Sequence, residues 1–106
     1  MGTIEKVILD KLKKAVAERF PLCKIILFGS RARRVADPQS DLDVLVILET
    51  DVDMQVEDYV SDCAWEAGFE YGIVVAPITV SRKEWEEGPE RSSLLALAVK
   101  AEGVTV

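Results

Sequence analysis

Apolar residues recur along this chain with two different periods, which predict alternating helices and strands. Over residues 3–20 they recur every three or four positions with lysines between them, as in a surface helix that stops before Pro21. Residues 23–28 and 41–48 are short, β-branched apolar runs typical of buried strands. The remaining predicted elements are a helix over 54–69, a strand over 73–80, a short helix capped by Ser81 with Glu84, a helix over 90–102 and a short edge strand over 104–106.

This order of elements predicts an α/β (α+β) fold, with a small mixed sheet of about three to four strands flanked by helices. The run over 41–48 is apolar on both faces beyond its first three residues, so we expect it in the centre of the sheet. Pro77 lacks an amide hydrogen, so the strand over 73–80 is expected at an edge or a bulge.

Length and hydropathy limit the protein class. A chain of 106 residues suffices for one hydrophobic core, so we expect a single domain over residues 1–106. No apolar run approaches the ~20 residues that cross a bilayer, and the N-terminal residues do not resemble an export signal. We therefore expect a cytoplasmic protein without a membrane partner.

The candidate chemistry begins where the strand over 23–28 ends. Gly29 has no Cβ, so the backbone can turn sharply and a ligand can approach it closely. Ser30 then offers a hydroxyl and free backbone N–H groups at the start of a helical turn, which suit phosphate oxygens. Taken alone, this common pair is better explained by an ordinary strand-to-helix turn with Ser30 as N-cap, so the pair by itself identifies no site.

Two aspartates at the start of the next strand add a second feature. In a strand, Asp41 and Asp43 point to the same face, roughly 7 Å apart along the chain. Such carboxylates can share divalent metal ions ~4 Å apart, the spacing of two-metal phosphoryl transfer. Both side chains could instead be solvated at the strand entry. However, aspartate is a poor strand former and two adjacent negative charges repel, so a bound cation explains the pair better.

Composition restricts the chemistry further. The chain has no histidine, which excludes a histidine base, so catalysis must use carboxylates, a metal, Arg or Lys. The net charge of −6 combines +6 over residues 1–35 with −12 over residues 36–106. This acidic majority makes nucleic acid an unlikely partner, because nucleic-acid binding needs a broad basic face.

The segment ILFGSRARRVADPQSDLDVLVIL resembles the minimal nucleotidyltransferase domain of the DNA polymerase beta superfamily. That family's signature is Gly-Ser, ten residues and Asp-x-Asp; here residues 31–40 separate Gly29-Ser30 from Asp41-Leu42-Asp43. The resemblance implies that Gly29 and Ser30 hold the β- and γ-phosphates of ATP or another nucleoside triphosphate. It also implies that Asp41 and Asp43 are catalytic and bind two Mg²⁺ ions.

The resemblance does not define the roles of the charged residues around this motif. Arg31 and Arg33 lie where they could contact phosphate, although solvated charges on a short helix explain them equally well. The family usually has a third carboxylate on the next strand, which ligates metal and helps to deprotonate the attacking hydroxyl. Residues 73–80 contain no acid. Glu70 is the nearest preceding candidate for a third metal ligand if the strand begins early; otherwise it is a surface charge at a helix end.

Small members of this family resemble the antitoxin half of toxin–antitoxin pairs, which implies a helical HEPN-type partner; a homo-oligomer is also open. Two functional hypotheses follow. The first is a Mg²⁺-dependent nucleotidyltransferase that moves a nucleoside monophosphate, AMP from ATP, to a protein hydroxyl. The second is a catalytically weak or inactive nucleotide-binding module that neutralises a HEPN partner by binding.

Overall fold

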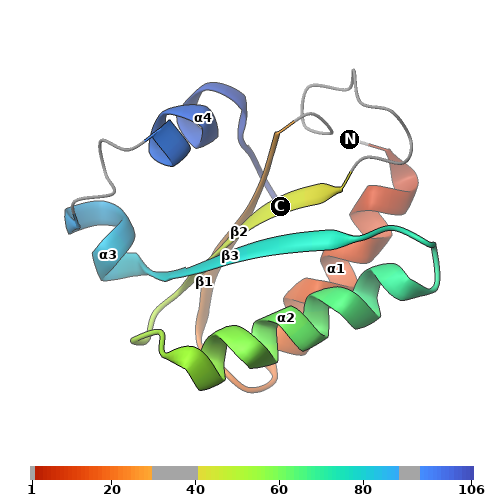
Figure 1. Cartoon of the computed structure of the whole chain (residues 1–106), viewed down its shortest axis with the longest axis horizontal. Coiled ribbons are helices and arrows are strands. Elements are labelled where there is room, and N and C mark those ends of the chain that lie inside the picture. Colours follow the sequence, from red (N-terminus) through yellow and green to blue (C-terminus); the bar gives the residue numbers. More distant parts are fainter. Residues whose placement is uncertain (1, 30–40, 89–93) are drawn as a thin grey trace.

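The computed structural model describes residues 2–29, 41–88 and 94–106 (Figure 1). Helices and strands alternate in the predicted order, and the α/β fold with a small mixed sheet is confirmed. The elements are α1 (Thr3–Ala17), β1 (Leu22–Phe28), β2 (Leu42–Leu48), α2 (Met54–Phe69), β3 (Val75–Ser81), α3 (Arg82–Glu87), α4 (Leu94–Glu102) and β4 (Val104–Thr105).

The sheet has the strand order β3-β2-β1-β4. β1 pairs antiparallel with both β2 and β4, whereas β2 pairs parallel with β3. The strand over 41–48 is therefore central and the strand with Pro77 lies at an edge, as predicted. A proline is tolerated there because an edge strand has a side without a partner strand.

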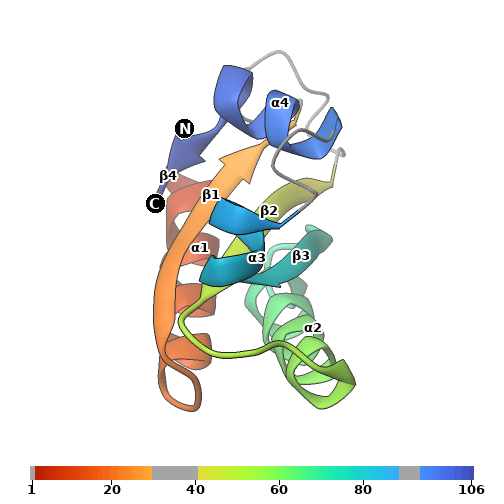
Figure 2. The same cartoon turned by 90° about the vertical axis from the view of Figure 1, so that its left-hand side faces the viewer.

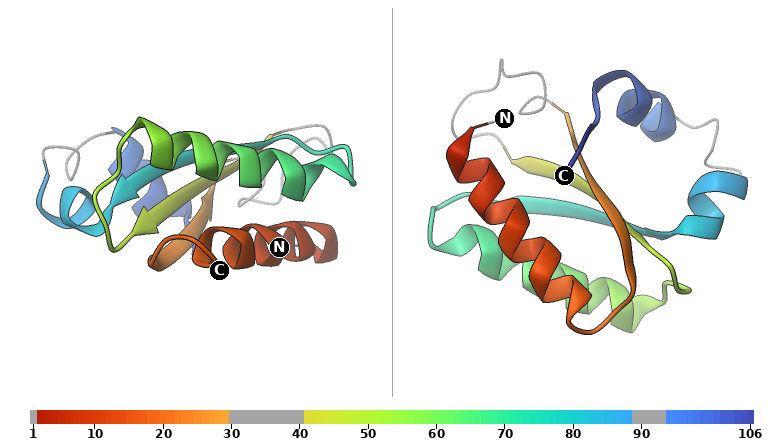
Figure 3. Two further views of the ribbon diagram at one scale, coloured as in Figure 1. Left: turned by 90° about the horizontal axis from the view of Figure 1, so that it is seen from below. Right: turned by 180° about the vertical axis from the view of Figure 1, so that it is seen from behind.

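Helices α1 and α2 cover one face of the sheet, where the larger core lies (Figures 1 and 3). Every second residue of β2, from Leu42 to Leu48, points into this core and is fully buried. Each helix contributes one buried apolar stripe: Ile8, Leu9, Leu12 and Val16 from α1, and Val56, Val60, Cys63, Ala64 and Ala67 from α2.

The opposite face carries a smaller cluster beneath α3 and α4 (Figure 2). Leu45 and Ile47 of β2 pack there with Ile26, Val80 and Val99. Because side chains alternate along a strand, Asp43 lies on this second face, in line with Leu45 and Ile47. The two faces of β2 therefore separate the main core from the candidate site.

Two element boundaries differ from the predictions for physical reasons. α1 ends at Ala17 and not at residue 20, because the chain turns there and places the Phe20 ring edge-on against Tyr59, 5.3 Å between centroids. β3 begins at Val75 and not at residue 73. After α2 the chain makes a turn in which Gly72 has a φ of +66° and the Ile73 amide donates to the Gly68 carbonyl.

Three predictions fall partly or wholly outside the described residues: the helical turns over 30–35, the turn over 36–40 and the first residues of the helix over 90–102. Within the described part of the chain, no helix is long and apolar enough to cross a membrane.

Candidate active site

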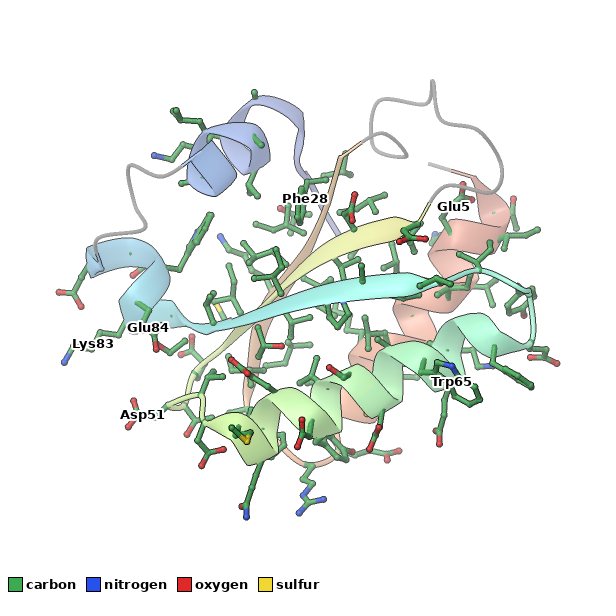
Figure 4. The ribbon with its side chains drawn as sticks, viewed as in Figure 1. Glu5, Phe28, Asp51, Trp65, Lys83 and Glu84 are labelled. Atoms are coloured by element: carbon green, nitrogen blue, oxygen red, sulfur yellow. The ribbon has the colours of Figure 1, made fainter. Side chains whose placement is uncertain are left out.

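The candidate site lies at one end of the sheet, where β1 ends beside the start of β2. The antiparallel register places Phe28 opposite Asp43, so the chain leaves β1 at Gly29 next to the first carboxylates of β2. Figure 4 shows Phe28 at this end of β1. Gly29 and Asp43, fourteen positions apart in sequence, are thus neighbours in space.

Gly29 meets two requirements that only glycine satisfies well. Its φ of +79° lies in the left-handed region, which L side chains rarely adopt. A Cβ at this position would also lie 2.5 Å from Oδ2 of Asp43, well inside van der Waals contact. The missing side chain therefore leaves room for the Asp43 carboxylate against the backbone.

Asp43 is half-buried, whereas Asp41, just before β2 begins, is exposed. Burial raises the pKa of the Asp43 carboxyl above its usual range, and the nearby charge of Asp41 raises it further. Both causes disfavour the charged form of Asp43. A cation placed between the two carboxylates would reverse this effect, because it favours the ionised form of each.

The neighbouring strand supplies no third carboxylate to this pair. In the parallel register Ala76 is the partner of Asp43, and the amide of Leu42 donates to the carbonyl of Val74 at 2.9 Å. Ala76 follows Val75, which points into the main core, so the Ala76 side chain lies on the same sheet face as Asp43. The position of β3 nearest to Asp43 is therefore apolar.

Glu70 lies elsewhere. It is the C-cap of α2, its side chain is largely exposed, and its Oε2 forms an ion pair with Nζ of Lys11 on α1 at 3.2 Å. This pair lies on the side of the sheet covered by α1 and α2. The structure thus does not bring Glu70 together with Asp41 and Asp43.

The donor set that remains fits magnesium only in part. Among residues 2–29, 41–88 and 94–106, no group of three or more acidic, histidine or cysteine side chains is arranged to hold a metal ion. Asp41 and Asp43 supply the oxygen ligands that Mg²⁺ prefers, and Mg²⁺ commonly takes one or two carboxylates together with substrate phosphates. Two carboxylates therefore suit a metal that arrives with a nucleotide. The other predicted nucleotide-binding residues, Ser30, Arg31 and Arg33, lie outside the described residues.

Sequence reasoning did not identify Ala76 as the position of β3 that lies beside Asp43. Nothing in the composition of the strand indicates it, because the register between β2 and β3 is set by pairing across 32 intervening residues. Periodicity gives the face of each strand but not its alignment with a neighbour.

Comparisons with known proteins identify the family of this chain. A family model described as the nucleotidyltransferase domain matches residues 9–98. This match covers most of the chain, so the protein belongs to the nucleotidyltransferase domain family.

Two relatives from Methanocaldococcus jannaschii carry names that describe an activity. The chain is 35% identical over 81 residues to "Putative protein adenylyltransferase MJ1305". This match covers 73% of this chain and 55% of that protein. It is 38% identical over 68 residues to "Putative protein adenylyltransferase MJ0128", covering 58% of this chain and 69% of that one. The chain thus spans about half of the first relative's length.

Solved structures share the fold. A toxin–antitoxin structure with AMP-PNP superposes with a TM-score of 0.61 at 21% identity, over 91% of this chain and 69% of that one. A complex of a tri-AMPylated Shewanella oneidensis HEPN toxin with an MNT antitoxin gives a TM-score of 0.54 at 19% identity, over 95% and 70% of the two chains. At these identities the likeness establishes the fold alone.

Replacing Gly29 by alanine tests the close approach of Gly29 to Asp43. Both Gly29→Ala and Gly72→Ala force a left-handed backbone on alanine, at a cost of about 1–2 kcal/mol, but a Cβ at Gly72 meets nothing within 4 Å. We expect Gly29→Ala to lower the free energy of unfolding more than Gly72→Ala does, measured by urea denaturation. In an Asp43→Ala background the difference should disappear. Equal losses for both variants in the wild-type background would contradict the contact.

Neutralising Asp43 should stabilise the metal-free protein. Folding raises the pKa of Asp43, so the folded protein holds this proton more tightly than the unfolded chain, and stability falls as the pH rises through the folded pKa. At neutral pH in EDTA, Asp43→Asn should therefore melt at a higher temperature than the wild type, and the difference should shrink on acidification. Asp51→Asn, at an exposed loop position, is the control. A lower melting temperature for Asp43→Asn would contradict the unfavourable burial.

Proposed function

We propose that this protein is a Mg²⁺-dependent nucleotidyltransferase that transfers AMP from ATP to a hydroxyl group of a partner protein. The observation that supports it most directly is the placement of Gly29 against the carboxylate of Asp43 at one end of the sheet. Family membership and the names of the relatives point to the same chemistry. Other nucleoside triphosphates remain alternative substrates.

Each residue has a proposed role. Gly29 and Ser30 hold the β- and γ-phosphates, with Arg31 and Arg33 available for further phosphate contacts. Asp41 and Asp43 hold the metal, and the magnesium supplies charge neutralisation of the triphosphate and of the leaving pyrophosphate.

The transfer has a simple balance of atoms. The acceptor oxygen forms a bond to the α-phosphorus while the bond from that phosphorus to the pyrophosphate oxygen breaks, and the hydroxyl proton must pass to a base. The register partner of Asp43 on β3 is Ala76, which cannot accept a proton. Among the described residues β3 therefore supplies no general base, and the proton passes to solvent water without the ~10²–10⁴-fold that a positioned base typically contributes to the rate.

This missing base supports a second candidate function. The protein would then be a catalytically weak or inactive nucleotide-binding module that neutralises a helical HEPN-type partner by binding. Under both hypotheses we propose a cytoplasmic protein in a toxin–antitoxin pair, because solved complexes with this fold join an MNT antitoxin to a HEPN toxin. A homo-oligomer is the other assembly to test.

A labelling experiment separates the two functions. Mg-ATP binding is first measured by titration calorimetry, with EDTA as the control. ATP labelled on the α- or on the γ-phosphate is then incubated with the protein and the product of the adjacent gene. AMP transfer predicts that only the α-label reaches the partner, and that Asp41→Asn and Asp43→Asn each abolish labelling.

The remaining outcomes also distinguish the enzyme from the binding module. Mg-ATP binding and partner neutralisation without any labelling would favour the binding module. Transfer of the γ-label would identify a kinase and contradict the proposal. The catalytic proposal fails if Mg-ATP does not bind at all.

An acid introduced on β3 should increase the rate. Ala76→Asp places a carboxylate on the register partner of Asp43. We expect it to raise the single-turnover rate of α-label transfer by about tenfold or more, within the range of general base catalysis. Ala76→Asn keeps the size without the base and should not. Equal rates for the acid and amide variants would show that proton removal does not limit the reaction.

A further inference from the structure

Helix α2 carries two exposed aromatic side chains on its outer side. Trp65 is 64% exposed and Phe69 is 67% exposed, although both are large and apolar. Their rings lie 4.7 Å apart between centroids at an angle of 30°. A shallow pocket beside them is lined by Trp65, Phe69, Gly72, Ile73, Val74 and Val75. We call these residues the α2 aromatic surface; Figure 4 shows Trp65 pointing away from the sheet.

This surface is separate from the packing of the helix. α2 already buries one stripe, which includes Val60, Ala64 and Ala67, against the sheet. Trp65 and Phe69 are four residues apart and stack along a second stripe on the other side of the helix. A helix that is apolar on two sides normally has a partner on each, and exposed apolar patches of this kind mark interaction sites.

The charges around the surface define what fits it. Helix α2 contains four acidic residues and no Lys or Arg. Asp58, Asp62 and Glu66 are exposed, and none of them forms an ion pair with any described residue. Asp62 lies three residues before Trp65 and seven before Phe69, and Asp58 lies seven before Trp65, so both acids flank the ring pair at helical spacing. The last turn of α2 has no basic residue either, and the partial negative charge of the helix end adds to this field.

We propose that the α2 aromatic surface binds an apolar segment of another protein that is flanked by Lys and Arg residues. Tryptophan beside a pocket is a common centre of binding energy, and the acidic rim selects a basic partner. A second copy of this chain is disfavoured, because a two-fold contact through this surface would place the acids of one α2 against those of the other. Nucleic acid is repelled by the same charges.

The surface is independent of the nucleotide site. α2 packs on the sheet face of Leu42 and Val44, whereas Asp43 lies on the opposite face with Leu45. A partner bound to α2 therefore leaves the Gly29 and Asp43 region open, and loss of one function need not affect the other.

The test uses defined peptides and tryptophan emission. Trp85 is first replaced by Phe, so that Trp65 is the only tryptophan in the chain. Three helical peptides of equal length are titrated: one with a leucine stripe flanked by lysines, one with the same leucines flanked by glutamates, and one with the lysines kept and the leucines replaced by serine. We expect the leucine–lysine peptide to bind at least ten times more tightly than either of the others, with a blue shift of the Trp65 emission.

Matched variants locate the contact, with the affinity measured by polarisation of a labelled peptide. Phe69→Ser should weaken leucine–lysine binding at least tenfold, whereas Ile4→Ser, at an exposed apolar position on α1, should not. Asp62→Lys should weaken binding, whereas Asp51→Lys makes the same change of charge away from the surface and should have little effect. Mg-ATP binding should be unchanged in Phe69→Ser. A failure of the α2 aromatic surface to bind the peptide is therefore distinguishable from a failure of the proposed enzymatic function.

Three results would overturn the proposal. If the peptide with glutamates binds as tightly as the leucine–lysine peptide, charge does not select the partner. If the peptide with serines binds as tightly as the leucine–lysine peptide, charge alone accounts for binding and the apolar contact contributes nothing. Concentration-dependent dimerisation in sedimentation velocity that Phe69→Ser abolishes would show that the occupant is a second copy of this chain.

Discussion

The candidate site depends on one register, the antiparallel pairing of β1 with β2 that sets Phe28 opposite Asp43. A slip by one residue would turn Asp43 toward the main core, where its neighbours Leu42 and Val44 are fully buried. An unpaired carboxylate in that core would cost several kcal/mol. The hydrophobic pattern of β2 therefore fixes the position of the acidic pair as firmly as it fixes the core, and Gly29 follows because β1 ends where that pair begins.

The protein keeps two energetically unfavourable features, and they lie on opposite sides of the sheet. At one, a half-buried carboxylate lies beside a second acid and a left-handed glycine. At the other, the Trp65 and Phe69 rings are exposed among acids that have no ion-pair partner in the described part of the chain. Neither feature stabilises the isolated fold, and each becomes favourable with the right ligand, a cation with nucleotide phosphates in the first case and a basic apolar segment in the second. Because the sheet separates them, both ligands can be bound together.

Much of this fold could be predicted from the sequence because its signals are local. The two-sided apolar run over 41–48 indicates a central strand, and Pro77 indicates an edge strand. The end of α1 depends instead on the contact of Phe20 with Tyr59, and the start of β3 depends on the turn at Gly72, both set by tertiary structure. For the site, spacing led to Gly29, Asp41 and Asp43. Finding Ala76 beside Asp43 required the register between strands, which periodicity does not contain.

The apolar residue Ala76 beside Asp43 affects the two candidate functions differently. Nucleotide affinity depends on the phosphate contacts and the metal ligands, whereas the transfer rate also depends on a base, so bound ATP alone does not distinguish an enzyme from a binding module. The loss of the ~10²–10⁴-fold rate contribution of a general base would be severe for an enzyme that turns over a free substrate. It matters less for a protein that modifies its own bound partner, because a lasting complex holds donor and acceptor together at a high effective concentration. On the proposed function, a slow transfer within a stable complex is therefore sufficient, and binding and chemistry become successive stages of one activity.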